Sequence, residues 1–456
     1  QFNVTQPFDR SIISHTYENG LGVIKFDGPV KLINKFTFTA PVTLISEIYL
    51  PDCIEHIGDG AISSNMLTTI RIPENLQRVD NFGISSPYLE KFTGHHISED
   101  GRCLIIDKAL CAFAPAGLKD YTFPSGIEQI KSNVIRECND LETIAFSEGL
   151  TEIQYLNINR CPKLKKVTFP HTLEKLGSPL FEECPSLEGF YGNDKFHTAD
   201  NRCLIAHQEP PLRPSTWHGL WLVKFAGGGL TEYTIPDGIK VIENNAIDGW
   251  ENLKKLTLSE DLVYVSASGI VNCPNLEGVF GPNTSSDHRG IQIGDEYVRL
   301  IIHDGYPGTY HVPDDVRSIG IWAFSGITTL EHITMGDQIT NIGGYAFSEC
   351  KNLKSVTLSG GLERIGTDAN IGYNPFLNSH NLESIYFRSY VPPTYLDSQM
   401  SEFDRLTVYV PSLSADLYKR DTGWEQFRKY MKEYECEDLT MPDYYVSTDF
   451  SKNGEV

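Results

Sequence analysis

The sequence has no run of 18 or more apolar residues, so no segment is predicted to cross a membrane as a helix. It contains no HExxH, P-loop, GxSxG or EF-hand motif. It also lacks a CxxC pair that would support a zinc site. We therefore expect no catalytic residues, no metal ligands and no cofactor, and we do not predict an enzyme.

Basic residues are scarce as well. The chain has 38 Lys and Arg against 60 Asp and Glu, which gives a net charge of −22, and no basic run occurs. A protein that binds phosphates needs clustered Lys and Arg, and this surface repels nucleic acid and anionic lipid. Nucleic acid is therefore not an expected partner.

A repeat of 23 residues organises the chain. It is clearest between Leu150 and Phe190, where similar residues recur at that spacing: Leu150 and Leu173, Ile153 and Leu176, Cys161 and Cys184, Leu164 and Leu187. A period in the twenties with leucine-type residues at fixed positions is typical of a leucine-rich repeat solenoid. We predict a right-handed solenoid rich in parallel β-strands, with short turns or 3-10 pieces between them.

Each repeat contains a short alternating strand that ends at proline, such as Thr69–Ile72 before Pro73. Period-2 alternation predicts a strand with one buried face, and proline ends it because it has no N–H to donate. From this pattern we predict an N-terminal cap at 1–46, the solenoid at 47–410, a small helical cap at 411–439 and a linker or tail at 440–456. In the helical cap, the residues expected to cover the last repeat are Leu417, Tyr418, Phe427, Tyr430 and Met431.

Ten cysteines are present, and five of them occupy one position of the repeat: Cys138, Cys161, Cys184, Cys273 and Cys350. Stacked repeats place equivalent residues roughly 4.8 Å apart with parallel side chains. A disulfide needs converging Cβ atoms about 3.5–4.5 Å apart. We therefore predict buried free thiols at this position.

The period is interrupted three times, near 94–118, 191–225 and 281–308. Each interruption is most simply explained as an inserted β-hairpin. Gly101 and Asn201 are residue types that suit tight turns. The second interruption is longer and carries Trp217 and Trp221 among prolines. It is either a loop that packs its tryptophans against the solenoid or a protrusion that binds a partner, because exposed Trp is typical of contact surfaces.

The strand positions between the apolar residues are expected to point outward. Many hold Thr, and others hold Tyr49, Arg71, His311 and Tyr386. The Thr residues are explained by β-branched side chains that fill stacked strands. The same polar face could bind an extended protein or a glycan, so these four residues join Trp217 and Trp221 as candidate binding residues.

The chain resembles bacterial BspA-type leucine-rich repeat proteins, which are common among secreted and surface proteins of gut Bacteroides relatives. The resemblance covers about 26–430 and rests on these stretches: APAGLKDYTFPSGI (114–127), IPDGIKVIENNAI (235–247), SIGIWAFSGITTLEHITM (318–335), NIGGYAFSECKNLKSVTL (341–358) and VYVPSLSADLYKRDTGW (408–424). It implies export and a role in protein interaction or adhesion, and it supplies no catalytic motif. The Trp-containing insertion and the loss of Cys from the third hairpin depart from the family pattern.

These features predict a monomeric, extracellular or cell-surface solenoid that binds protein, such as a host or matrix protein, without catalysis. Two alternatives stay open. One is a glycan-binding accessory module. The other is the recognition domain of a longer protein, because STDFSKNGEV (447–456) resembles the junction to a C-terminal metallopeptidase domain. An export signal is expected upstream of Gln1.

Overall fold

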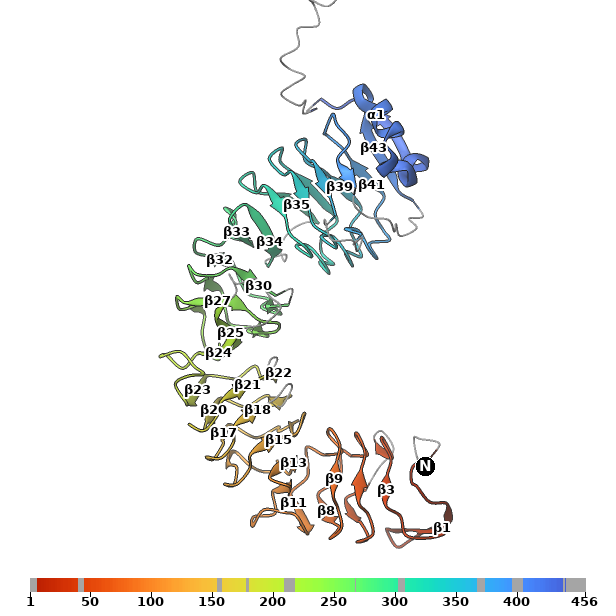
Figure 1. The fold of residues 1–456 in the computed structure, drawn as a ribbon, viewed down its shortest axis with the longest axis vertical. Helices are drawn as coiled ribbons and strands as arrows, with labels where there is room; N and C mark the ends of the chain where they lie inside the picture. Colours follow the sequence, from red (N-terminus) through yellow and green to blue (C-terminus); the bar gives the residue numbers. More distant parts are fainter. Residues whose placement is uncertain are drawn as a thin grey trace, which may run out of the picture. The chain divides into compact units, whose positions relative to one another are not determined.

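A computed structural model describes residues 6–39, 45–153, 158–177, 180–208, 218–266, 268–301, 308–366, 374–395, 405–437 and 439. The chain, whose elements are labelled in Figure 1, divides into two compact units. Unit 1 comprises 1–230, 241–252 and 268–273, and unit 2 comprises 231–240, 253–267 and 274–456.

Most coils in the described part of the solenoid begin with a short strand of alternating burial. In β8 (Thr69–Ile72), Ile70 and Ile72 are buried and the residues between them are half-exposed, as predicted. One or two further strands, mostly two residues long, complete the coil. We call the three positions first-row, second-row and third-row strands, and the strands of one row stack in parallel in several successive ladders.

Unit 1 contains complete three-row coils. Its first-row strands are β5 (Glu47–Tyr49), β8, β11 (Lys91–Gly94), β14 (Asp120–Thr122), β17 (Thr143–Ala145), β20 (Lys166–Phe169) and β23 (Gly189–Gly192). Its second-row strands are β3 (Leu32–Ile33), β6 (His56–Ile57), β9 (Arg78–Val79), β15 (Gln129–Ile130), β18 (Glu152–Ile153) and β21 (Lys175–Leu176). Its third-row strands are β4 (Phe38–Thr39), β7 (Ile62–Ser63), β10 (Ile84–Ser85), β16 (Ile135–Arg136), β19 (Ile158–Asn159), β22 (Phe181–Glu182), β28 (Ile247–Asp248) and β31 (Ile270–Val271).

In unit 2 most coils replace the third strand with turns. Its first-row strands are β26 (Glu232–Thr234), β29 (Lys255–Thr257), β32 (Gly278–Phe280), β35 (Thr309–Val312), β37 (His332–Met335), β39 (Ser355–Thr357), β41 (Ser384–Tyr386) and β43 (Thr407–Pro411). The second-row strands from residue 239 onward are β27 (Ile239–Ile242), β30 (Tyr264–Val265), β36 (Ser318–Ile319), β38 (Asn341–Ile342), β40 (Arg364–Ile365) and β42 (Thr394–Tyr395).

Antiparallel hairpins interrupt the coils at each predicted interruption. They are β12 (Cys103–Ile106) with β13 (Ala109–Phe113), β24 (Cys203–Gln208) with β25 (Gly219–Phe225), and β33 (Gly290–Ile293) with β34 (Glu296–Leu300). Gly101 and Asn201 have φ values of 72° and 63°, which matches their expected role in tight turns. A further hairpin, β1 (Ile12–Glu18) with β2 (Leu21–Phe26), precedes the first coil.

The first and third hairpins carry the same hydrogen-bond chain made from different residues. In the first, Cys103 Sγ lies 3.3 Å from the Tyr121 hydroxyl, which donates to Asp100 at 2.9 Å. The register places Gly290 where Cys103 stands, since the two pair with Leu300 and Phe113 respectively. There the Tyr297 hydroxyl takes the place of the thiol and lies 2.9 Å from the Tyr310 hydroxyl. The cysteine missing from the third hairpin is thus replaced by a tyrosine on the neighbouring strand.

Stacked aromatic rings form part of each core. In unit 1, Phe123, Phe146, Phe169 and Phe190 stack with centroid separations of 5.1, 6.2 and 6.4 Å. In unit 2, Phe324 stacks on Tyr297 and Phe347 at 5.3 Å each. Where one position of successive coils is aromatic, as at Phe123, Phe146 and Phe169, offset stacking adds to the burial energy.

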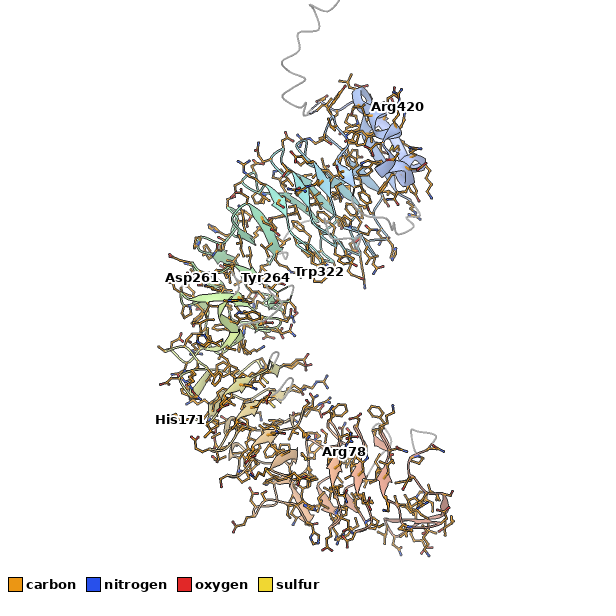
Figure 2. The ribbon with its side chains drawn as sticks, viewed as in Figure 1. Arg78, His171, Asp261, Tyr264, Trp322 and Arg420 are labelled. Carbon is orange, nitrogen blue, oxygen red and sulfur yellow. The ribbon has the colours of Figure 1, made fainter. Side chains whose placement is uncertain are left out.

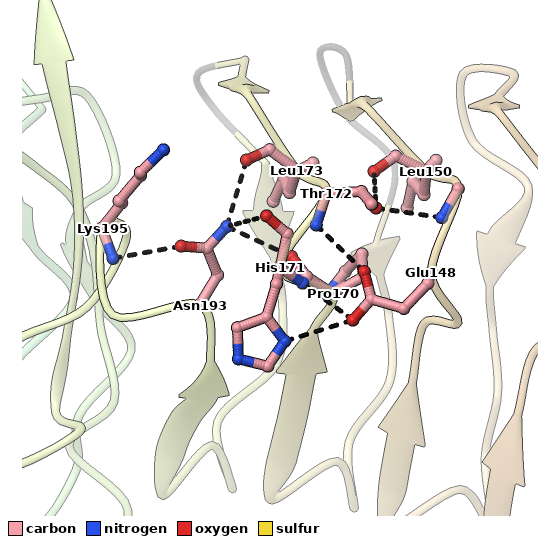
Figure 3. Close-up of polar contacts among 9 residues, drawn as sticks. Glu148, Leu150, Pro170, His171, Thr172, Leu173, Asn193 and Lys195 are labelled. Carbon is pink, nitrogen blue, oxygen red and sulfur yellow. Dashed lines mark hydrogen bonds and ion pairs between the residues drawn. The ribbon is translucent and has the colours of Figure 1, made fainter.

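Polar side chains join successive coils where the first-row strands end (Figure 3). The Glu148 carboxylate accepts hydrogen bonds from the backbone N–H of His171 at 3.1 Å and of Thr172 at 3.0 Å in the next coil. These backbone donors, His171 first, lower the pKa of Glu148. The buried Asn193 amide donates to the carbonyls of Pro170, His171 and Leu173. Part of the acidic content therefore holds the solenoid together.

The C-terminal cap returns to the sheet, which the helical pattern did not predict. Helix α1 (Ala415–Arg420) and the 3-10 helix η3 (Thr422–Tyr430) are followed by strand β44 (Met431–Tyr434), which pairs with β43. Tyr418 and Phe427 are buried as expected, whereas Leu417 is 40% exposed. Among the described residues, no helix is long and apolar enough to cross a membrane.

All ten cysteines are free thiols, and seven of them are buried. Four residues of the repeated position, Cys138, Cys161, Cys184 and Cys350, are buried, which confirms the prediction for them, and Cys273 is half-buried. Burial raises the pKa of Cys103 to about 12 and that of Cys350 to about 11. Little thiolate is therefore available for reaction at these positions near neutral pH.

Iodoacetamide should alkylate Cys53 and Cys436 of the folded protein at pH 8 well before it reaches the seven buried thiols, because half-buried sulfurs meet the reagent. The third half-buried thiol, Cys273, should react more slowly than these two, because burial raises its pKa to about 11. Peptide mass spectrometry after timed quenching measures each site, with protein unfolded in urea as the control in which all ten sites react. Rapid labelling of Cys161 or Cys184 in the folded protein would contradict the buried arrangement.

Candidate functional site

The outward face of the first-row ladder in unit 2 collects two of the candidate residues predicted from the sequence. The strand register places one row of side chains across β35, β37, β39, β41 and β43: His311, Thr334, Thr357, Tyr386 and Tyr409. His311 and Tyr386 therefore lie in the same row, separated by two threonines. We call this five-strand surface, with β44 at its edge, the unit 2 strand face.

A second outward row lies two residues earlier on each strand: Thr309, His332, Ser355, Ser384 and Thr407. Side chains within the rows hold one another in place. His311 Nδ1 lies 2.8 Å from Thr334 Oγ1, and His332 Nδ1 lies 2.6 Å from Ser355 Oγ. The face is thus lined by hydroxyl and imidazole groups whose orientations are fixed before any partner arrives.

Three tyrosines gather at the C-terminal end of this face. Tyr386 and Tyr409 stack with centroids 4.5 Å apart and planes 4° from parallel. Tyr434 meets both rings edge-on at 5.7 and 6.2 Å, and its hydroxyl donates to the Phe387 carbonyl at 2.6 Å. We call Tyr386, Tyr409 and Tyr434 the tyrosine cluster. All three are half-buried, so each is partly accessible to solvent while it packs against the others.

Arg388 follows the cluster on the same chain segment and is also held in place. Its guanidinium lies 3.0 Å from Asp337 and donates to the Met335 carbonyl at 3.2 Å. The ends of β37 and β41 therefore carry a fixed ion pair beside the tyrosines. Within the described residues, no group of three or more His, Cys, Asp or Glu side chains is arranged to hold a metal ion.

The two candidate residues of unit 1 are neighbours on adjacent strands. Tyr49 pairs in register with Arg71, and Tyr49 is 75% exposed. The Arg71 guanidinium donates to the Leu50 carbonyl at 2.9 Å and lies 3.0 Å from Asp52. The Arg71 hydrogen bond is the main cause of a lowered pKa at Asp52. The Arg71 guanidinium is thus engaged by the chain segment that follows β5. Of these two candidate residues, only Tyr49 is freely exposed.

The two tryptophans of the second insertion have different places. Trp221 is 1% exposed on β25 and belongs to the core, so it does not form part of an exposed binding surface. Its burial follows the first of the two interpretations of this insertion, in which the loop packs its own tryptophan against the solenoid. Trp217 lies outside the described residues.

The sequence patterns did not predict a second exposed aromatic pair, Trp322 and Tyr345. Trp322 and Tyr345 stack at 5.8 Å, and Trp322 is 43% exposed. Both adopt left-handed conformations, with φ of 60° and 55°, and Arg299 Nη1 donates to the Trp322 carbonyl at 2.9 Å. Their 23-residue spacing was the available signal, since it places both rings at one repeat position.

The model of the BspA-type leucine-rich repeat region matches the sequence in six copies, over residues 10–97, 109–207, 223–289 and 308–399. This match covers well over half of the chain. The chain belongs to the BspA-type leucine-rich repeat family. A search of curated proteins gives no match.

Solved structures of bacterial leucine-rich repeat proteins are similar to this BspA-type chain. A leucine-rich cell surface protein from Faecalibacterium prausnitzii A2-165 is 18% identical, with 75% of this chain and 85% of that chain covered and a TM-score of 0.46. The pneumococcal vaccine antigen PcpA is 15% identical, with 95% and 97% covered and a TM-score of 0.43. A leucine-rich repeat protein from Bacteroides ovatus ATCC 8483 is 15% identical, with 95% and 99% covered and a TM-score of 0.29.

Proposed function

We propose that this BspA-type protein is a non-catalytic, extracellular binding solenoid that recognises a protein through the unit 2 strand face. The observation that carries the proposal is the tyrosine cluster beside Arg388, at one end of two ordered rows of hydroxyl and imidazole groups. The family assignment supports an interaction or adhesion role in general. The tyrosine cluster and the two polar rows support the unit 2 strand face as the surface for that interaction.

The composition of the face suits a protein partner. Tyr and Arg are enriched where binding energy concentrates, because they offer large contact areas together with hydrogen-bonding groups. The stacked rings of Tyr386 and Tyr409 have already lost side-chain freedom, so binding costs less conformational entropy there. The hydroxyl rows continue the surface away from the cluster and can pair with the backbone and polar side chains of a partner.

Replacing Tyr386 and Tyr409 together by Ser should weaken binding to the protein ligand at least 30-fold, because each hot-spot truncation costs about 2 kcal/mol or more. The measurement is biolayer interferometry against a panel of purified extracellular-matrix proteins, each tested before and after enzymatic deglycosylation. Saturable binding that survives deglycosylation is the expected result for a protein ligand.

Tyr49→Ser is the matched control, since Tyr49 is also an outward tyrosine on a first-row strand but lies in unit 1 with 75% exposure. It should leave affinity unchanged. Circular dichroism melting of each variant separates lost binding from lost folding. Equal losses in the control and the double variant, or binding that disappears with the glycan, would refute the assignment of a protein site to this face.

A further inference from the structure

A polar cleft of about 620 Å³ lies in unit 1, where the first hairpin interrupts the second-row ladder. The ladder β3–β6–β9 ends at β9, and a new one begins with the hairpin strands β12 and β13 and continues through β15, β18 and β21. In Figure 1 this break lies between the labels β9 and β13. The cleft is therefore a product of the insertion, and its volume falls within the ~300–1,000 Å³ typical of ligand sites.

The two sides of the cleft come from different ladders. Arg78, Asp80 and Asn81 line one side, from β9 and the turn after it. Asp107 and Gln129 line the other, from the hairpin tip and from β15. Val79, Ile106 and Ala109 add apolar contact to the lining. The walls thus offer hydrogen-bond donors and acceptors around a small apolar surface.

Asp80 is a fixed acceptor in this cleft. Its Oδ1 accepts from Arg78 Nε at 2.6 Å, and its Oδ2 lies 2.8 Å from His56 Nε2. Burial of the carboxyl opposes ionisation, but the hydrogen bonds from His56 and Arg78 outweigh it and the pKa of Asp80 is lowered. Asp80 therefore carries its charge at neutral pH in one orientation.

Arg78 supplies hydrogen-bond donors beside the Asp80 carboxylate. Only its Nε is used by Asp80, and among the described residues neither Nη atom of Arg78 has a hydrogen-bond partner. The Arg78 side chain is 70% exposed, so its N–H groups remain open to a ligand (Arg78 is labelled in Figure 2). Asn81 is also exposed and adds an amide next to Asp80.

The hairpin tip holds Asp107 in a defined position. Asp107 and Lys108 form a two-residue loop with φ of 49° and 62°, which is the pattern of a type I′ turn. Lys108 does not line the cleft, and its side chain pairs instead with Glu128 of the next coil, with Nζ 2.5 Å from Oε1. The third hairpin has Gly294 and Asp295 in the equivalent loop, so a carboxylate at the first loop position distinguishes the first hairpin from the third.

We infer that this cleft binds a neutral saccharide, a second ligand beyond the protein partner proposed for the unit 2 strand face. Each hydroxyl of a sugar donates and accepts, which matches a lining that mixes carboxylates, amides and a guanidinium. Asp59, Asp80 and Asp107 repel an anionic ligand, while Arg78 and Lys131 disfavour a cationic one. An extended peptide would find a β9 edge only two residues long, which provides few backbone hydrogen bonds.

The experiment uses the full chain on an array of neutral, sialylated and sulfated oligosaccharides, followed by titration calorimetry with the best neutral ligand. Asp107→Gly should weaken that binding at least tenfold, because it removes a charged acceptor from the cleft wall. Folding should be unaffected, since glycine adopts positive φ freely and stands at this place in the third hairpin. Asn81→Ala, on the opposite wall, should also weaken binding.

Lys108→Gly is the matched control. It changes the same loop to Asp-Gly, a favoured type I′ sequence, and leaves the lining carboxylates in place. It should bind the saccharide with unchanged affinity, as should the Tyr386→Ser, Tyr409→Ser double variant, whose site is separate. The inference is overturned if no neutral saccharide binds, if charged glycans bind better, or if Asp107→Gly binds as well as the parent chain.

Discussion

Replacing Gly290 by Cys should destabilise unit 2 by about 2–3 kcal/mol, and adding Tyr297→Leu should recover most of that loss. A Cβ atom at Gly290 would lie 2.0 Å from the Tyr297 hydroxyl oxygen, so the ring must move out of a close-packed site. Tyr297 is fully buried and stacks on Phe324 at 5.3 Å, so it has no free space to enter. The cost is the overpacking penalty of a filled core.

The recovery follows from the first hairpin, which already contains the exchanged pair. There Cys103 occupies the position of Gly290, and Leu110 occupies that of Tyr297. With Leu at 297, the new thiol can approach the Tyr310 hydroxyl as Cys103 approaches Tyr121. The Tyr310 hydroxyl would then keep its bond to Asp287, now 2.9 Å long.

Urea unfolding of the four chains in the double-mutant cycle measures this coupling. Tyr297→Leu alone should also destabilise, since it empties part of the core and removes a buried hydroxyl partner of Tyr310. A positive coupling energy requires the double variant to be more stable than the sum of the single losses predicts. Additive losses would mean that the Cys and Leu pair of the first hairpin cannot replace the Gly and Tyr pair of the third.

Much of the solenoid could be predicted from the sequence because one spacing controls it. The 23-residue period and the Pro-terminated alternating strands predicted the first-row ladder, and the repeated cysteine position predicted buried thiols. The return of the chain as β44 was not predictable, because Met431–Tyr434 follows directly on residues with a helical pattern. Its strand conformation comes from pairing with β43, which is a tertiary effect rather than a local preference.

The candidate surface was predictable only in part. Period 2 places His311 and Tyr386 outward, and the register then brings them into one row. Their partner Tyr434 comes from the unpredicted strand, so the cluster could not be assembled from spacing alone. Trp322 and Tyr345 lie in turns with positive φ, where no alternation rule gives the direction of a side chain. Burial of Trp221 likewise depends on how its hairpin packs.

Three glycines mark the places where the chain leaves the regular coil for a hairpin. Gly94, Gly192 and Gly281 end or follow the first-row strands before the three hairpins and have φ of 96°, 97° and 112°. A Cβ atom at these positions would approach a carbonyl oxygen of the preceding coil, to 2.3 Å at Gly94, 2.1 Å at Gly192 and 2.9 Å at Gly281. In the preceding coils the corresponding residue is a buried apolar one, such as Ile72 or Phe169.

Gly192→Ala should therefore cost more than about 3 kcal/mol of unfolding free energy, which combines the penalty for a side chain at positive φ with a direct collision with the Phe169 carbonyl. The coil must open at that step, because the obstructing atom belongs to the backbone and has no alternative rotamer. Gly94→Ala should follow closely, and Gly281→Ala should cost less, in the order of the three approach distances. Urea midpoints by far-UV circular dichroism give the ranking, and hydrogen exchange shows whether the loss begins at the strand that ends at Gly192.

Gly126→Ala separates the cost of a side chain at positive φ from the cost of a collision with the neighbouring backbone. Gly126 also has positive φ, at 87°, but a Cβ atom added there would have nothing within 4 Å. It should lose only about 1–2 kcal/mol, the conformational cost alone. If Gly192→Ala and Gly126→Ala cost the same, the close approach to Phe169 has no energetic consequence. The diversion of the chain would then depend on the hairpin sequences and not on the glycine before each one.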